Sequence, residues 1–440
     1  MVSLLSNLLC LWMVSLVFGA GLLGLLLSMT VPAVGAAFVP LVSLGVRYVL
    51  FGSGLLESLP LHALYFNTAL SVLWLVYVYA LFAVCAIARR ERSRWWIAGA
   101  LAVTMLLATA RFNALQFERG SLHVTALDVG QGDCIYIQLP DGKDMVIDCA
   151  NYNDDKKYEK KTFDYLDTYI TDDTVEYLML THCDSDHVYF MDELLGRYQV
   201  EKLFMPNVLA APGTTSKDKK ALQDQIDALD TSRFTDKDTI GTVTYAEFFI
   251  AALTEPNCEI VLNVDSNVNT NSIIIEETTY RLVFYCPTQE YYDDSNLNSA
   301  ERKNAISPIG ILEYNGRRIM FTGDSNELNE PLVVERTGKI DCDVLKVGHH
   351  GSATSTRNPF LDAYTFEYAI ISCNTYGNKF NHPRQSTLDR LKAHDIAVYR
   401  TDNNGNIVVS VDKDGNIKIT TQKEWNKEEN YKGYSTGSDD

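Results

Sequence analysis

Apolar residues are concentrated in three long stretches within the first 120 residues of the chain. They run from Leu4 to Met29, from Ala63 to Ala88 and from Trp95 to Ala110. The first two are long enough to cross the hydrocarbon core of a membrane, which needs about 20 apolar residues, and the third is shorter but uncharged. Three such stretches favour membrane helices over buried helices of a water-soluble protein. The two later stretches also argue against a cleaved leader peptide.

A fourth apolar stretch, from Gly35 to Ser58, is interrupted by residues that disfavour burial in lipid. Pro40, Arg47 and Glu57 fall inside it, together with several glycines. We therefore predict an interfacial or re-entrant helix in this stretch, with a full membrane crossing as the alternative.

The orientation of these helices follows from a cluster of basic residues. Four arginines between residues 89 and 94 lie in one loop between the last two predicted crossings. Positively charged loops remain in the cytoplasm, so the helix that begins at Trp95 leads outward. We expect three crossings, with Met1 inside the cell and everything after Arg111 outside it.

From Ser121 onward the pattern changes to short apolar runs that are separated by turns rich in Gly and Asp, and such runs predict β-strands. Helical periodicity occurs between them at Lys156–Ile170, Lys217–Leu229 and Gln385–His394. Strands interspersed with helices predict a layered α/β domain. The predicted strands are 121–128, 135–139, 144–148, 175–181, 306–312, 317–322, 344–347 and 368–372, followed by a hairpin within 401–419.

Charge separates the same two parts of the chain. Residues 1–120 carry seven Lys/Arg against three Asp/Glu, whereas residues 121–440 carry 31 against 53, a balance of −22. A strongly acidic domain repels a polyanion, so a broad basic face for nucleic acid is excluded and any attraction to DNA must be local. The nine cysteines form no CxxC pair, which argues against a cysteine zinc site and a disulfide framework.

The strongest chemical signal is the segment T-H-C-D-S-D-H, which follows the apolar run V-E-Y-L-M-L. It places His182, Asp184, Asp186 and His187 within six residues at the end of a predicted strand. A loop at that position can wrap its ligands round a pair of cations. The chain has only eight histidines, so two of them meeting by chance in an acidic turn is a poor explanation.

Two further polar segments also follow predicted strands. F-T-G-D ends at Asp324, and V-L-K-V-G-H-H-G-S contains Lys346, His349 and His350. T-G-D alone would usually be a turn. Metal ligands must converge from separate elements, so polar clusters at three strand ends together predict a metal site.

These motifs resemble those of the metallo-β-lactamase superfamily, and specifically those of the ComEC-type competence proteins. The matching segments, in the family's order, are L-D-V-G-Q-G-D, I-D, T-H-C-D-S-D-H, T-G-D, L-K-V-G-H-H-G-S and N-H-P. The resemblance covers about Ser121 to Lys418, and the apolar first part resembles the end of that family's channel region. It implies an α/β fold, a metallo-β-lactamase-like αββα sandwich preceded by a short bundle of transmembrane helices.

The resemblance also implies how two divalent metal ions would be held. His182 and Asp184 would bind one ion, Asp186 and His187 the other, and Asp324 would bridge them. A site with this many carboxylates suits manganese or zinc, with magnesium as an alternative.

Other residues are given supporting or substrate-binding roles by the same resemblance. His350 is the expected remaining metal ligand, with His349 beside it for phosphate contact. Lys346 and His382 are candidates for binding the scissile phosphate or protonating the leaving oxygen, and a purely structural role is the alternative for both. Asp128, Asp133 and Asp148 are expected to orient the ligands, and Gly130 and Gly132 to serve the tight turn alone. The chain departs from the family's pattern at Val188, Tyr189 and Phe190, which are expected to narrow the mouth of the site or change its substrate.

We therefore expect a binuclear metal-dependent hydrolase in the cell membrane, with residues 1–111 as membrane helices, 112–420 as an extracytoplasmic hydrolase domain and 421–440 as a flexible polar tail. Its expected substrate is DNA during competence-related uptake, as in degrading the strand that is not imported. A separately encoded competence channel or DNA receptor is an expected partner. The alternatives are a phosphodiesterase for cell-wall polymers or nucleotides, and a non-catalytic DNA-binding part of a DNA transport complex.

Overall fold

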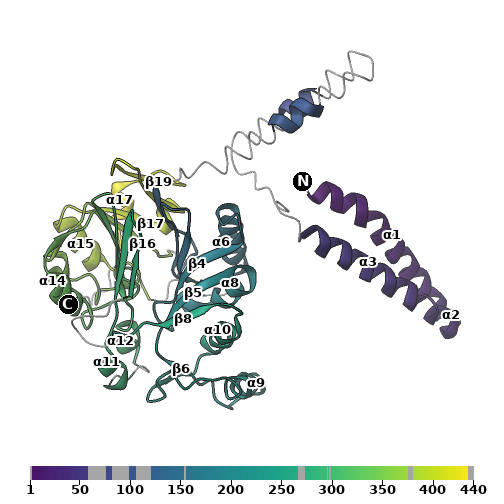
Figure 1. Cartoon of the computed structure of the whole chain (residues 1–440), viewed down its shortest axis with the longest axis horizontal. Helices are drawn as coiled ribbons and strands as arrows, with labels where there is room; N and C mark the ends of the chain where they lie inside the picture. Colours follow the sequence, from purple (N-terminus) through teal and green to yellow (C-terminus); the bar gives the residue numbers. More distant parts are fainter. Residues whose placement is uncertain are drawn as a thin grey trace. The chain divides into compact units, whose positions relative to one another are not determined.

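The chain divides into two compact units, Met1–Gln116 and Phe117–Asp440, in the computed structural model (Figure 1). The structure describes residues 2–57, 76–81, 99–105, 120–152, 155–265, 273–294, 296, 299–374 and 380–434. The predicted arginine loop lies outside these residues, as do most of the predicted crossings Ala63–Ala88 and Trp95–Ala110.

The first unit contains a pair of long apolar helices, α1 (Val2–Ser28) and α3 (Val39–Glu57), joined through the short α2 (Pro32–Ala36). Its segments Cys10–Ser28 and Pro32–Gly52 are long and apolar enough to cross a membrane, judged by length and composition. Large apolar side chains such as Phe18 are exposed along both helices. An apolar surface of this kind suits a lipid environment better than water.

In the described part of the stretch that begins at Gly35, α2 ends at Ala36 and α3 runs from Val39 to Glu57. Pro40 is the second residue of α3, where the first turn has no intrahelical partner for its backbone nitrogen and therefore tolerates proline. Gly45 packs against Val17 of α1, and a Cβ there would come within 2.3 Å of the Val17 Cγ2 atom. The helix is thus long enough for the full crossing that was only the alternative in our prediction.

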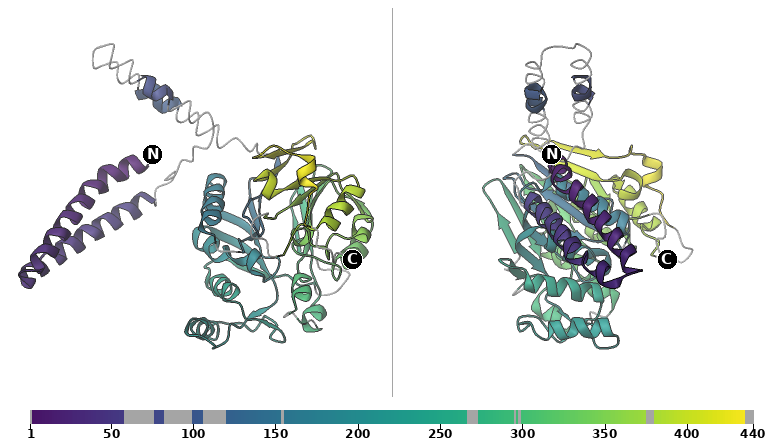
Figure 2. Two further views of the ribbon diagram at one scale, coloured as in Figure 1. Left: turned by 180° about the vertical axis from the view of Figure 1, so that it is seen from behind. Right: turned by 90° about the vertical axis from the view of Figure 1, so that its right-hand side faces the viewer.

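The second unit is built from two packed β-sheets. The first sheet, in spatial order, comprises β19 (Ile417–Thr421), β18 (Ile407–Val411), β1 (Leu122–Ala126), β2 (Cys134–Gln138), β3 (Asp144–Cys149), β4 (Thr174–Met179), β5 (Gln199–Met205) and β8 (Glu259–Leu262). The second comprises β17 (Ala397–Arg400), β16 (Tyr368–Ile371), β14 (Val344–Lys346), β12 (Arg317–Phe321), β11 (Ile309–Tyr314), β10 (Tyr280–Tyr285) and β9 (Ile273–Glu276). The hairpin β18–β19 pairs with β1 through β18, so the last strands of the second unit lie in the same sheet as its first strand (Figure 2).

Helices cover the outer face of each sheet (Figure 1). Apolar residues of α6 (Lys156–Tyr169), α8 (Met191–Arg197) and α10 (Val243–Thr254) share a core with the first sheet, and those of α13 (Glu330–Thr337), α14 (Asn358–Leu361) and α15 (Gln385–Ala393) share one with the second. A third core lies between the sheets and includes Ile147, Phe284 and Phe321. The predicted αββα sandwich is therefore confirmed. The remaining short elements are α7 (Ser185–Val188), α9 (Lys217–Ile226), α11 (Gln289–Asp294), α12 (Ala300–Asn304), α16 (Thr401–Asn404), α17 (Lys427–Asn430), β6 (Leu209–Ala210), β7 (Thr239–Ile240), β13 (Ile340–Asp341), β15 (Tyr364–Thr365) and a 3-10 turn Gly348–Gly351.

Strand direction decides where loops can meet. β3, β4, β5 and β8 run parallel to one another in the first sheet, and β12, β14, β16 and β17 do so in the second. Loops at the carboxyl ends of parallel strands gather along one edge of a sheet, which is where α/β proteins build their binding sites. Each sheet can therefore bring several loops to one place.

The expectation of a flexible tail from residue 421 is wrong for the part that the structure describes, which ends at residue 434. The Asn430 amide is buried and donates to the Val398 carbonyl and to Asn404, and the backbone of Tyr434 pairs with that of Arg384. Polar composition suggested fraying, but these polar groups are satisfied by the body of the domain.

Candidate metal centre

The first group of candidate ligands lies on the loop that follows β4. Asp184 caps the single helical turn α7, and His187 is the third residue of that turn. The His187 ring is fully buried between two carboxylates, with Nδ1 2.7 Å from Asp148 and Nε2 3.1 Å from Asp324. Because a carboxylate only accepts, the Nδ1–H donates to Asp148, and Nε2 points at Asp324. Burial lowers the pKa of His187, but Asp324 and Asp148 raise it well above its ordinary value.

Asp148, at the end of β3, holds this loop in place. Its two oxygens accept hydrogen bonds from the Thr181 backbone nitrogen and hydroxyl, each at 2.8 Å. Its backbone φ of +55° lies in the left-handed region, a conformation that costs free energy and that surrounding contacts must impose. Asp148 therefore contacts both the loop and the His187 imidazole.

The second group comes from the other sheet. Asp324 follows β12, and His349 and His350 follow β14 in a turn where both have positive φ, +47° and +53°. His350 Nδ1 donates to the Ser372 carbonyl at 3.0 Å, and its Nε2 lies 3.4 Å from Asp186 Oδ2 on the first sheet's loop. Two sheets therefore contribute to one centre.

Asp324 lies in the middle of this centre, and its two oxygens face different partners. Oδ1 is 3.1 Å from His187 Nε2 and 3.8 Å from His350 Nε2. Oδ2 is 3.8 Å from His182 Nε2 and 3.7 Å from His349 Nε2. Burial raises the pKa of this carboxyl, but His187, His350 and His349 together hold it well below its usual range.

Several of these atoms have no hydrogen-bond partner among the described residues. They are the Nε2 atoms of His182, His187 and His350 and the Oδ1 atom of Asp324, all of them buried. Their ligand atoms form compact groups: His182, His187 and Asp324 lie within 4.8 Å of one another, and so do Asp186, His187 and His350. Buried polar atoms are nearly always hydrogen-bonded, and imidazoles held through one nitrogen with the other directed inward are typical of metal ligands. The residues therefore fit a divalent cation.

Asp184 is placed differently from the other three motif residues. It belongs to none of the compact groups formed by the described residues, and its Oδ1 contacts the Lys303 ammonium. Burial raises its pKa, but His182 and Lys303 lower it to about 2. The amide of Asn304, oriented to satisfy both neighbours, donates to Asp184 Oδ2 at 3.1 Å and accepts from His349 Nε2 at 3.2 Å. Sequence reasoning missed Lys303 and Asn304, because α12 carries no motif.

Lys346 does not reach the surface of the site. Its side chain is 3% exposed, and Nζ donates to Asp133 Oδ2 at 2.8 Å and to the Val347 carbonyl at 3.1 Å. Burial raises the pKa of Asp133, but Lys346, His350 and His187 together lower it below its ordinary value. The structure therefore assigns Lys346 to a buried ion pair and gives it no direct path to a phosphate.

The loop Leu127–Asp133 divides into two parts with different functions. Asp128 pairs with Lys161 of α6 at 2.7 Å and contacts none of the candidate ligands, contrary to the role expected for it. Asp133 supports the centre, because its backbone nitrogen donates to the Asp186 carbonyl at 3.0 Å. Gly132, with φ +147°, is required at this contact, since a Cβ would come within 2.7 Å of the Asp186 carbonyl oxygen.

Rings line the mouth of the centre. His382 is 6% exposed, and its ring lies 5.0 Å from that of His349 and 6.1 Å from that of Phe380. Burial and the neighbouring imidazoles lower the pKa of His382 to about 3. The Phe380 ring in turn meets Tyr152 edge-on at 5.2 Å.

The three residues after His187 do not narrow this mouth as we expected. Val188 and Phe190 are buried in the core between the first sheet and its helices, where Phe190 packs near Phe163, and Tyr189 packs against the same core.

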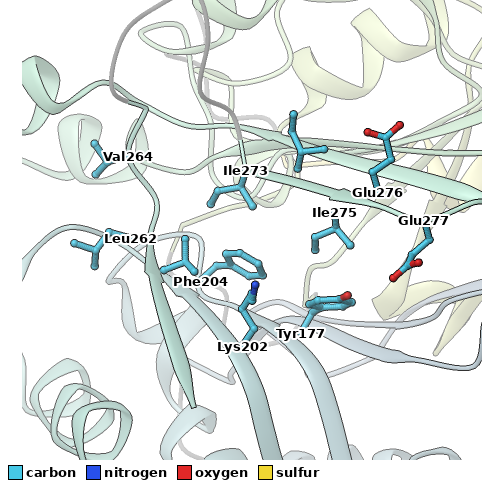
Figure 3. A pocket seen from close by; sticks show the side chains of 11 residues that line it. Tyr177, Lys202, Phe204, Leu262, Val264, Ile273, Ile275, Glu276 and Glu277 are labelled. Carbon is cyan, nitrogen blue, oxygen red and sulfur yellow. The ribbon is translucent and has the colours of Figure 1, made fainter. Parts of the chain in front are cut away.

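A separate pocket of about 420 Å³ lies between β4, β5 and β8 of the first sheet and the edge strand β9 of the second (Figure 3). Tyr177, Lys202 and Phe204 of the first sheet face Ile273 and Ile275 of β9 across it. No His, Cys or Asp is found among the described residues that line it, and Lys202 pairs with Glu259 at 3.0 Å. Glu276 and Glu277 supply carboxylates, but the described lining has none of the imidazoles of the metal centre.

Comparison with known proteins agrees with this geometry. Residues 127–256 match the model of the metallo-beta-lactamase superfamily. The chain is 27% identical over 348 residues to ComE operon protein 3 of Bacillus subtilis, covering 76% of this chain and 38% of that protein. It is 37% identical over 114 residues to competence protein ComA of Neisseria gonorrhoeae, covering 25% of this chain and 16% of that protein. The chain therefore spans well under half the length of these relatives.

Comparison with solved structures finds low similarity. The metallo-beta-lactamase fold protein YhfI from Bacillus subtilis is 9% identical, with a TM-score of 0.36, over 65% of this chain and 98% of its own. Zinc-bound PqqB from Methylobacterium extorquens is 10% identical, with a TM-score of 0.35, over 66% of this chain and 99% of its own. Overlaps of this extent say nothing about the chemistry of the site.

Proposed function

Because the chain is a relative of the ComEC-type competence proteins and carries a metallo-β-lactamase domain, we propose that this domain is a metal-dependent phosphodiesterase that cleaves DNA during uptake. One observation carries the proposal. Three imidazole Nε2 atoms and an Asp324 oxygen converge from both sheets on a buried centre without hydrogen-bond partners among the described residues.

We assign two cation positions on either side of Asp324. His182 and Asp184 would hold one, and Asp186, His187 and His350 would hold the other. The division is supported by the two Asp324 oxygens, of which Oδ2 faces His182 and Oδ1 faces His187 and His350. The mixed carboxylate and imidazole donors suit manganese or zinc, with magnesium as the alternative.

The cations, when bound, would supply an activated water and stabilise the negative charge that develops on the phosphate. The protein's own groups prepare the site for that chemistry. Asp148 fixes the tautomer of His187, and Lys346 compensates the charge of Asp133 beneath the centre. His382, neutral because its pKa is about 3, would bind a phosphate oxygen as a hydrogen-bond donor, with His349 beside it.

The acidic domain would attract DNA only where the cations lie. Residues 121–440 carry a balance of −22, so the site must overcome a repulsive field at a distance. A nuclease of this kind should therefore lose less activity in raised salt than one that docks DNA on a basic face.

We also propose a multi-pass membrane protein with the hydrolase domain outside the cell, acting beside a separately encoded competence channel or DNA receptor. The apolar helices α1 and α3 and the similarity to competence proteins support membrane association. A protease added to intact cells should reach the domain. Complete protection until lysis would contradict the orientation.

The proposed activity is tested on the full chain, purified in detergent, stripped of metal and reloaded with manganese or zinc. We expect close to two metal ions per chain by elemental analysis and cleavage of labelled single- or double-stranded DNA. His187→Ala should lose both properties. His394→Ala is the matched control, because His394 pairs with Asp362 at the surface, away from the centre.

The other outcomes assign the alternatives. Cleavage of a small phosphodiester without cleavage of DNA would favour an extracytoplasmic phosphodiesterase for cell-wall polymers or nucleotides, which the acidic surface also suits. DNA binding without any cleavage, by a chain that holds its metal, would favour a non-catalytic part of a DNA transport complex.

A further inference from the structure

We propose that Tyr152 and Phe380 form a base-stacking subsite beside the metal centre, so that the domain prefers single-stranded nucleic acid over phosphodiesters that carry no base. This inference rests on the proposed phosphodiesterase function. It adds a substrate class and a binding surface that lie outside the metal ligands.

The subsite is a continuous row of rings that leads away from the centre. Asp324 lies 3.7 Å from His349 Nε2, the His349 ring lies 5.0 Å from that of His382, and the His382 ring lies 6.1 Å from that of Phe380. Tyr152 then meets Phe380 edge-on at 5.2 Å. A phosphate at the centre would therefore place the base of an adjoining nucleotide within reach of Phe380.

The outer end of the row is exposed although it is apolar. Phe380 is 38% exposed, one of four large hydrophobic residues of the second unit that are exposed among those described. Of these four, it is the residue whose ring adjoins the imidazoles at the mouth. The backbone of Tyr152 is fixed by a 2.7 Å hydrogen bond to the Gln131 carbonyl, in the loop that supports the centre. An exposed ring beside a fixed partner resembles a stacking platform more than a packing defect.

Charge explains why such a platform would be needed. Proteins that hold single strands usually combine aromatic rings with a basic groove, and this domain has a strongly acidic balance. Stacking does not depend on charge and accepts any base. A duplex hides the faces of its bases in the helix, so the platform would favour unpaired strands.

Binding can be measured separately from cleavage. The full chain in detergent, loaded with manganese, is titrated with a single-stranded oligonucleotide that contains 2-aminopurine, whose fluorescence falls when the base stacks, and phosphorothioate linkages, which slow cleavage. We expect quenching with wild type and its loss with Phe380→Ala. Phe380→Leu, which retains apolar volume but has no π-face, should also lose it, whereas Phe380→Trp should retain it.

Cleavage provides the second measurement. Removing a stacking ring typically weakens binding of a base by about 5-fold to 100-fold, so kcat/KM for a single-stranded oligonucleotide should fall within that range in Phe380→Ala. Activity on a small phosphodiester without a base should change less than about twofold. Ile274→Ala is the matched control, because Ile274 is also exposed and apolar but lies on β9.

The outcomes separate this inference from the proposed function. If wild type cleaves the oligonucleotide but neither quenching nor kcat/KM depends on Phe380, the stacking subsite is wrong and the phosphodiesterase stands. If quenching depends on Phe380 but no phosphodiester is cut, the proposed activity fails and the subsite remains as a binding surface. An equal loss on the base-free substrate would show that Phe380 only supports the fold.

Discussion

The strand β3 has a buried aspartate near each end, and the two lie in opposite environments. Asp144 accepts a hydrogen bond from Tyr136 at 2.6 Å, but burial and the neighbouring Glu176 raise its pKa to about 8. Asp148, four residues later, accepts hydrogen bonds from His187 and Thr181. Burial beside other carboxyls therefore raises the pKa of Asp144, whereas Asp148 is surrounded by an imidazole and by backbone and hydroxyl donors.

Buried carboxyls of the second sheet repeat this contrast. Glu330 accepts hydrogen bonds from the backbone of Thr356 and Arg357, yet burial raises its pKa to about 7. Asp324 is buried as deeply, and its pKa is held low by His187, His350 and His349. Asp324 and Glu330 therefore differ in the groups that surround them and not in burial.

The largest effect should follow from Asp324→Ala. This change removes the carboxylate that faces all four neighbouring imidazoles, so kcat/KM should fall by about 10³-fold or more and the metal content should drop. Asp362→Ala, at an exposed aspartate, is the control. Retention of activity within tenfold, with two metal ions still bound, would show that Asp324 is not shared between the cations.

A smaller effect is expected from Asp148→Asn at the supporting end of β3. The variant would lose the negative charge that fixes His187, and metal affinity should fall about 10- to 100-fold, measured by competition with a chelator. The fold should persist, because asparagine has nearly the same volume. An unchanged affinity would mean that Asp148 only shapes the loop.

Lys303→Gln should change catalysis by only about two- to fivefold, since an ion pair of this partly exposed kind contributes roughly 0.2–1 kcal/mol. The change would free Asp184 from its ammonium partner. Metal affinity should rise or stay level, because Lys303 competes with a cation for the same oxygen. A tenfold loss of metal affinity would overturn that interpretation.

Asp144→Asn should leave activity unaltered and change only the dependence of stability on pH. The pKa of Asp144 rises from 3.8 to about 8 on folding. The folded protein therefore favours the protonated form of Asp144. Its contribution to the free energy of unfolding is complete below about pH 4 and is lost as the pH rises toward 8. Denaturant unfolding at several pH values should give a flatter profile for the variant. An identical profile would show that Asp144 does not titrate as its surroundings indicate.

The sequence predicted the layered fold well, because strand ends are marked both by apolar runs and by the polar loops that follow them. Several other expectations were wrong for local physical reasons. Asp128 is engaged by Lys161, and Lys346 by Asp133. Such pairings join residues that are far apart in sequence.

The polar surroundings of Asp184 were beyond prediction for the same reason. Lys303 and Asn304 lie more than a hundred residues after Asp184, on a helix of five residues without a recognisable motif. Their importance appears only when α12 is seen beside the loop that follows β4. The motif identified Asp184, whereas Lys303 and Asn304 were identified only by their contacts with it in the folded domain.

The convergence of both sheets on one centre also links metal supply to folding. A ligand that binds only the folded site raises the free energy of unfolding, and the increase grows with the logarithm of the ligand concentration. It reaches about 2.7 kcal/mol when that concentration is 100 times the dissociation constant. His187 and Asp324 belong to different sheets and meet only when the sandwich closes. Bound cations would then hold the two sheets of the domain together. A chain deprived of metal would unfold at lower temperature and would also lose its proposed activity.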